Sequence, residues 1–162
     1  EGPVLVDPCL LALGQFGFDL WRQRISLGDT IGQGRPEAVE AMLAAVSDVV
    51  PVTRLAGHFH DTSGRALENI EVSLARGVRV FDAAVGGLGG CPYAPGAAGN
   101  VATEAVHQRL LALGYETGLD GAVLLKAAEM ARRAWEVTSD GAEATDRVIG
   151  FVRKALDPKA RG

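Results

Sequence analysis

The stretch "RLAGHFHDTSGRALENIEVSLARGVRVFDAAV", residues 54–85, decides the fold. Its first seven residues, 54–60, have the apolar content and length of a strand, and "DTSG" after them is typical of a loop. Residues 65–76 repeat apolar side chains at helical spacing and stop before Gly77, and residues 78–85 predict a second strand. A helix joined to two strands by short connections indicates a parallel βαβ unit.

The same order of elements continues on both sides of this unit. Upstream, residues 24–29 predict a strand, and Pro36 begins a helical pattern that runs to Val50. Downstream, a glycine-rich loop over 86–100 leads to a predicted helix over 102–113. We expect Thr103 to cap that helix. The whole pattern predicts an α/β fold with parallel strands.

The two ends of the chain are also predicted to be helical. Two further helical patterns, 121–135 and 142–156, follow the last βα unit. Residues 4–23 are predicted to be helical as well, although Pro8 and two glycines interrupt the pattern at a cost in helix stability.

Length and composition restrict the class of protein. The chain has 162 residues, 48% of them apolar and 22% charged, as expected for one globular domain. A net charge of -4 gives no basic footprint for nucleic acid or for an anionic membrane surface, so we expect neither as a partner. No basic segment at the start resembles a signal peptide. The two cysteines, Cys9 and Cys91, favour a reducing compartment, and Cys9 is assigned no role.

Polar side chains gather where the predicted strands end. In parallel α/β architectures, binding and catalytic groups lie at the carboxyl ends of the strands. The residues expected at that edge are Asp29, His58, His60, Asp82, Cys91 and Asn100.

His58 and His60 carry the strongest chemical signal. They lie two residues apart on a strand, so both side chains point to the same face and could share one divalent cation. The alternative is that one or both are ordinary polar residues at the rim of the sheet. A structural zinc site is disfavoured because no CxxC pair lies nearby.

The two aspartates have competing interpretations. Asp29 could act as a general acid or base, or accept a hydrogen bond from a metal-binding imidazole. It could equally cap a turn, because "GDTIG" is typical turn sequence. For Asp82 the structural role is favoured, and His107, in the helix after the glycine-rich loop, is expected on the surface.

Cys91 lies between Gly90 and Pro92 in the glycine-rich loop. Most unpaired cysteines are buried and structural. A loop thiol beside a cation is instead typical of a reactive cysteine, and the glycines would let the loop act as a lid. The P-loop pattern is absent, so we do not expect a phosphate loop.

Three motifs carry a family resemblance. "ISLGDTIG" (25–32), "HFHDT" (58–62) and "GLGGCPYAPGAAGNVATE" (87–104) resemble motifs of the 3-hydroxy-3-methylglutaryl-CoA (HMG-CoA) lyases, in the same order and spacing. "EGPV" at residues 1–4 resembles the end of an earlier strand of that family. On this alignment the resemblance runs from residue 1 to about residue 137.

The resemblance implies a fold and a reaction. The fold would be the C-terminal portion of a (β/α)8 barrel, with about three parallel strands and extra helices at its end. The reaction would be the cleavage of HMG-CoA to acetyl-CoA and acetoacetate, as in leucine degradation and ketone-body formation. By this resemblance His58, His60 and Asn100 bind Mg²⁺ or Mn²⁺, Cys91 is the catalytic thiol, and Asp29, with His58, assists catalysis.

The resemblance also implies that residues 1–162 form only part of a pyruvate carboxyltransferase-type barrel domain, without its N-terminal half. An aspartate ligand and a neighbouring arginine on early strands of the family have no counterpart here, so we expect the chain alone to be inactive or nearly so. Two alternatives stay open: a Claisen-type condensing enzyme similar to isopropylmalate or homocitrate synthase, and a non-catalytic half barrel.

Partners and compartment follow as expectations. We expect an acyl-CoA substrate, with a homodimer left open. The abundance of Ala, Gly and Arg favours a bacterial cytoplasm, with the mitochondrial matrix expected if the protein is eukaryotic.

Overall fold

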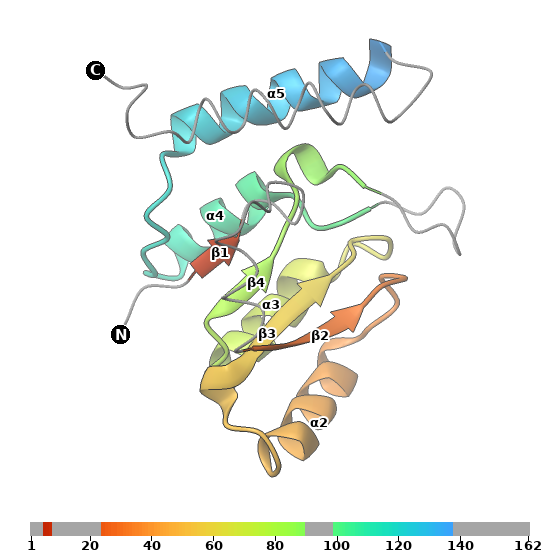
Figure 1. Ribbon diagram of the computed structural model, residues 1–162, viewed down its shortest axis with the longest axis vertical. Helices are drawn as coiled ribbons and strands as arrows, with labels where there is room; N and C mark the ends of the chain where they lie inside the picture. The colour runs from red at the N-terminus through yellow and green to blue at the C-terminus, as the bar shows by residue number, and fades with distance from the viewer. Residues whose placement is uncertain (1–4, 8–23, 90–98, 138–162) are drawn as a thin grey trace.

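A computed structural model describes residues 5–7, 24–89 and 99–137 of the chain. Its centre is a parallel sheet with the strand order β1-β4-β3-β2 (Figure 1). The strands are β1 (Leu5–Asp7), β2 (Ile25–Asp29), β3 (Leu55–Phe59) and β4 (Val80–Asp82). The three strands from β2 to β4 follow one another in the sheet as they do along the chain, as expected for successive right-handed βα units.

The described part of the chain contains four helices besides the sheet. They are α2 (Pro36–Ser47), α3 (Ala66–Ala75), α4 (Thr103–Ala112) and α5 (Gly121–Val137), and two 3₁₀ turns, η1 (Val52–Arg54) and η2 (Val85–Gly87), lie beside β3 and β4. Figure 1 shows α2 and α3 beside the strands and α5 across the end of the molecule towards which β4 points. No helix in the described part of the chain is long and apolar enough to span a membrane.

The core lies between the helices and one face of the sheet. Leu55, Phe59 and Phe81 are almost completely buried there, together with apolar side chains of α2, α3 and α4. Gly57 sits among these rings, and a Cβ atom at this position would lie 2.7 Å from the Phe59 ring and 3.0 Å from the Phe81 ring. Glycine is therefore required where β3 passes beneath the two aromatic side chains.

A second apolar cluster attaches α5 to the rest of the fold. Val85 of η2 packs with four buried residues of α5, namely Leu124, Ala127, Ala128 and Ala131. The N-terminus of α5 is capped by Asp120, whose carboxylate accepts hydrogen bonds from the backbone N–H groups of Ala122 and Val123 at 2.9 and 3.1 Å. This helix is therefore fixed both at its start and along its buried face.

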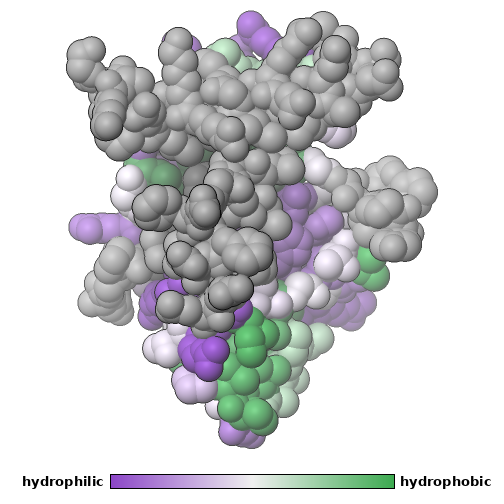
Figure 2. All heavy atoms as spheres, in the orientation of Figure 1, coloured by the Kyte–Doolittle hydropathy of each residue, from purple (hydrophilic) through white to green (hydrophobic). Residues whose placement is uncertain are grey.

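Some of the exposed apolar side chains gather at one end of the fold. Figure 2 shows them at the lower end of the view, where α2 lies in Figure 1. Val49, just after α2, is 83% exposed.

The α/β fold with parallel strands is confirmed, and three details of the prediction are wrong. Leu5–Asp7 form a strand beside β4 instead of a helix. Pro8 disfavours helical backbone at the residue before it, and the free edge of β4 offers hydrogen-bond partners to an extended segment. Val80–Asp82 is also shorter than the predicted strand over 78–85.

Thr103 does not cap α4, because Ala102 occupies the cap position and Thr103 is the first helical residue. The hydroxyl of Thr103 is buried without a hydrogen-bond partner in the described part of the chain. The predicted helix over 142–156, residues 1–4 and most of the predicted helix over 4–23 lie outside the described residues.

Candidate functional site

The two histidines lie side by side at the carboxyl end of β3. Their ring centroids are 5.2 Å apart and the rings are inclined by 55°. Alternation along the strand places His58 and His60 on the face opposite Leu55 and Phe59, whose side chains enter the core. The structure thus brings the two imidazoles together as the sequence predicted.

His60 is the more buried of the two, with 7% of its surface exposed. Its Nδ1 is buried and has no hydrogen-bond partner in the described part of the chain. Burial lowers the pKa of His60 below 6.5, and the neighbouring His58 lowers it further, while Asp29 partly opposes both effects. The lowered pKa favours the neutral imidazole, the form that binds metal ions.

Asn100 is brought to His60 by the strand-like segment that leaves the glycine-rich loop. The backbone N–H of Val101 donates to the carbonyl of Phe59 at 3.1 Å, and the N–H of Asp61 donates to the carbonyl of Gly99 at 3.0 Å. His60 and Asn100 form an antiparallel bridge between these bonds. The side-chain Nδ2 of Asn100 donates to the Leu88 carbonyl at 3.2 Å. This bond fixes the amide nitrogen and leaves the side-chain oxygen, the donor type that hard cations prefer.

Asp82 contacts His58 across the sheet. The two residues are paired in register between β3 and β4, and Asp82 Oδ2 lies 3.6 Å from His58 Nδ1. The same oxygen accepts a hydrogen bond of 3.0 Å from the Ser26 hydroxyl, and Asp82 is buried. A carboxylate facing one ring nitrogen orients a metal-binding histidine through its other nitrogen. The sequence favoured a structural role for Asp82, and this contact with a candidate ligand could be found only from the strand register.

Asp29 organises the loop after β2. Its two carboxylate oxygens accept backbone hydrogen bonds from Gln33 at 3.1 Å and from Gly34 at 2.6 Å. On α3, the buried Asn69 side chain donates to the Gly34 carbonyl at 3.1 Å, which ties the loop to the helix. The turn interpretation therefore describes the observed contacts of Asp29, and its catalytic role stays a prediction.

His107 is buried, so the prediction that it lies on the surface is wrong. Only 5% of the residue is exposed, and its Nδ1 lies 2.7 Å from the hydroxyl oxygen of Thr117. The start of α5 covers the ring, because a Cβ atom at Gly121 would be 3.0 Å from His107 Nε2. The helical pattern did not reveal this contact, because the covering residues come from the next element.

The described residues offer part of a metal site. They contain no group of three or more His, Cys, Asp or Glu side chains arranged to hold a metal ion. Two imidazoles and an amide nevertheless converge, and one buried imidazole nitrogen lacks a partner. This donor set fits one side of a divalent cation, with further oxygen ligands required to complete its coordination. Cys91 lies outside the described residues.

Helices packed on a parallel sheet, with imidazole and amide side chains at its carboxyl ends, place the chain among the α/β proteins that carry their sites at strand ends, the class to which (β/α)8 barrels belong. The family model described as HMGL-like matches residues 18–131. The chain belongs to the HMGL-like family.

Relatives of this family are similar over most of the described region. The hydroxymethylglutaryl-CoA lyase of Pseudomonas mevalonii is 54% identical over 103 residues, which are 64% of this chain and 34% of that protein. The mitochondrial lyase of Arabidopsis thaliana is 50% identical over 129 residues, which are 80% of this chain and 27% of that protein. A crystal structure of the HMG-CoA lyase from Brucella melitensis superposes with a TM-score of 0.64 at 61% identity, covering 65% of this chain and 38% of that one. The chain thus spans about a third of the length of the relatives it matches.

Proposed function

We propose that this chain supplies one wall of a divalent-metal-dependent carbon–carbon lyase that cleaves HMG-CoA to acetyl-CoA and acetoacetate. The observation that carries the proposal is the group formed by His58, His60 and Asn100 at the carboxyl edge of the sheet. Its support is the strong similarity of the surrounding segment to proteins named as HMG-CoA lyases.

In the proposed site, His58, His60 and the Asn100 side-chain oxygen hold Mg²⁺ or Mn²⁺. The bound ion would polarise the tertiary hydroxyl of the substrate and hold its carboxylate. Asp82 keeps the His58 ring oriented through Nδ1. The hydroxyl proton leaves along a path formed by His58 and Asp29. Because a His58 ring with one nitrogen on the ion and the other facing Asp82 has no free lone pair, the Asp29 carboxylate would accept the proton while His58 holds the ion and the substrate oxygen in place.

Cys91 completes the proposed reaction as a proton donor. When the hydroxyl proton leaves, the oxygen forms the ketone of acetoacetate and the bond between C2 and C3 breaks. The electron pair remains on C2 of the acetyl-CoA fragment, which must then be protonated at carbon. A thiol on the glycine-rich loop supplies that proton, and the resulting thiolate is reprotonated from solvent.

The partners and compartment are part of the same proposal. The substrate is an acyl-CoA thioester, a homodimer is the assembly to look for, and neither nucleic acid nor membrane is proposed as a partner. We place the protein in a bacterial cytoplasm, or in the mitochondrial matrix if it is eukaryotic; relatives carry both mitochondrial and cytoplasmic names.

A chimera tests the proposal. The aligned 103-residue segment of the Pseudomonas mevalonii lyase is replaced by that of this chain, and products from HMG-CoA are identified by mass spectrometry. We expect acetyl-CoA and acetoacetate in equal amounts from the chimera. The 162-residue chain alone with Mn²⁺ is expected to release neither product at a measurable rate, because its donor set covers only one side of the cation.

Two other outcomes favour the alternatives. A chimera that joins acetyl-CoA to a 2-oxo acid, yet does not cleave HMG-CoA, would indicate a Claisen-type condensing enzyme. A folded chimera without either activity would indicate a non-catalytic segment. Substantial cleavage of HMG-CoA by the isolated chain would contradict the proposal that this segment supplies only one side of the active site.

A further inference from the structure

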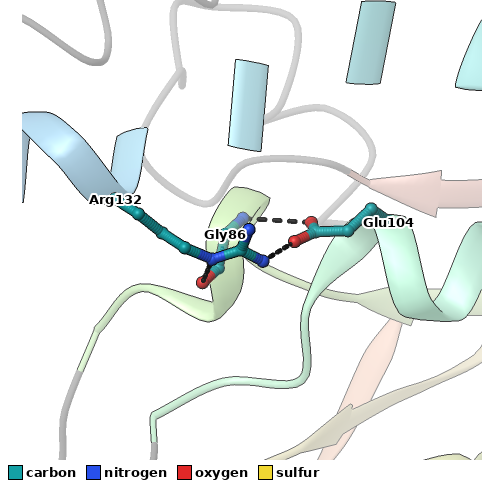
Figure 3. A network of polar contacts seen from close by, with 3 residues as sticks. All are labelled: Gly86, Glu104 and Arg132. Carbon is teal, nitrogen blue, oxygen red and sulfur yellow. Dashed lines mark hydrogen bonds and ion pairs between the residues drawn. The ribbon is translucent and has the colours of Figure 1, made fainter. Parts of the chain in front are cut away.

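The turn that opens the glycine-rich loop is held by two charged side chains from different helices. Figure 3 shows Gly86 between Glu104 of α4 and Arg132 of α5. The backbone N–H of Gly86 donates to Glu104 Oε2 at 3.0 Å, and Arg132 Nε donates to the Gly86 carbonyl at 3.3 Å. Arg132 Nη2 also pairs with Glu104 Oε1, which closes the network. The backbone N–H and the backbone carbonyl of Gly86 are therefore both held by side chains.

The three residues are arranged so that each depends on the others. Glu104 is buried, with 9% of its side chain exposed, whereas the Arg132 side chain is about half exposed. A buried carboxylate requires compensating donors, and the two donors recorded here are the Gly86 N–H and the Arg132 guanidinium. Without Arg132 the carboxylate would keep one backbone donor and would attract water or move.

The backbone at this turn leaves little room for another arrangement. Gly86 and Gly87 have φ values of +76° and +68°, which favour glycine. A Cβ atom on Gly86 would lie 3.4 Å from both Arg132 Cγ and the Ala128 carbonyl oxygen, so α5 approaches the turn closely. A displacement of the Arg132 side chain should therefore change the direction of the backbone after Gly87.

That direction determines where the Leu88 carbonyl meets Asn100. Leu88 follows the turn directly, and its carbonyl accepts the hydrogen bond from Asn100 Nδ2. Gly87 also packs against the backbone of Asn100, since a Cβ atom on Gly87 would be 3.5 Å from the Asn100 carbonyl oxygen. Arg132 is thus linked to a candidate metal ligand through only three residues of the chain.

We propose that Arg132 is a positioning residue: with Glu104 it clamps Gly86 and so sets the orientation of the Asn100 side chain. The part of this inference that concerns metal binding rests on the proposed function, whereas the effect on Asn100 does not. Sequence reasoning could not have found Arg132, because it lies 46 residues from Gly86 on a helix that the motifs do not include.

The test compares Arg132→Met with Arg133→Met in the full 162-residue chain. Arg133 is the matched control, because it is exposed and, within the described part of the chain, its ion pair is with Glu129 of the same helix. Hydrogen exchange by NMR should show the Gly86 amide and the Asn100 side-chain amide protons exchanging roughly five- to tenfold faster in Arg132→Met. The Val101 amide, which is bonded to Phe59, should be unchanged, and Arg133→Met should match the parent chain.

Two further measurements separate positioning from general loosening. Arg132→Lys, which keeps one cationic donor, should recover part of the protection at both sites. Titration with Mn²⁺ should show an affinity roughly tenfold lower for Arg132→Met than for the parent chain or Arg133→Met.

The outcomes are distinguishable. If the parent chain alone binds no Mn²⁺, its one-sided donor set is too weak without the ligands from the rest of the barrel, and the exchange of the Asn100 amide protons alone decides the role of Arg132. Exchange at Gly86 and Asn100 within twofold of the parent chain would overturn the inference. Uniformly faster exchange that includes Val101 would also overturn it, because the role of Arg132 would then be general stability.

Discussion

Replacing Cys91 with alanine in the chimera should lower the turnover of HMG-CoA by roughly 10²–10⁴-fold, the usual contribution of a positioned general acid. The acetyl-CoA carbon would then have to take its proton from water or from a less well placed group. Because the thiol is assigned to proton transfer and not to metal binding, the KM for HMG-CoA and the affinity for Mn²⁺ should change little. Steady-state kinetics and a Mn²⁺ titration of the same variant measure both quantities.

Cys9→Ala is the matched control for this prediction, since Cys9 is the other cysteine of the chain and is assigned no role. In a version of the chimera that retains residue 9, this substitution should leave turnover within twofold of the parent. Loss of less than tenfold on replacing Cys91 would contradict its role as proton donor.

Phe81→Ala should cost about 3–5 kcal/mol in the free energy of unfolding, the usual penalty for removing a fully buried phenylalanine. Phe81 has no exposed surface, and its ring packs over Gly57 between β4 and β3. Its loss leaves a cavity that the close-packed glycine strand cannot fill. Urea denaturation of the chain, followed by circular dichroism, measures the change.

Leu111→Ala on α4 serves as the control, because that side chain is 52% exposed. It should change the free energy of unfolding by no more than about 0.5 kcal/mol. Equal destabilisation by the two substitutions would show that the core is not centred on Phe81.

Sequence periodicity was sufficient to predict the repeated βα units. The predicted strands over 24–29 and 54–60 and the helix over 65–76 match β2, β3 and α3 closely, because apolar spacing and glycine stops are local signals. Leu5–Asp7 was assigned to a helix because its extended form depends on pairing with Val80–Asp82, which is distant in the sequence. Non-local pairing of this kind leaves no periodic signature in three residues.

The candidate site was predictable only where local sequence carried the signal, as for the fold. His58, His60 and Asn100 were selected from strand ends and motifs, and the structure places them together. The contact between Asp82 and His58 depends on strand register. The burial of His107 depends on the packing of α5. Such contacts join elements far apart in the sequence, so only the folded chain reveals them.

The metal dependence of cleavage by the chimera tests the central claim most directly. After complete removal of metal with a chelator, turnover of HMG-CoA should fall below detection and return in proportion to added Mn²⁺ until one ion is bound per active site. The chimera carrying His60→Ala should stay inactive at the same concentrations, while remaining folded by circular dichroism. Full turnover by the metal-free chimera, or undiminished turnover by the His60→Ala chimera, would contradict a metal-dependent lyase site at His58, His60 and Asn100.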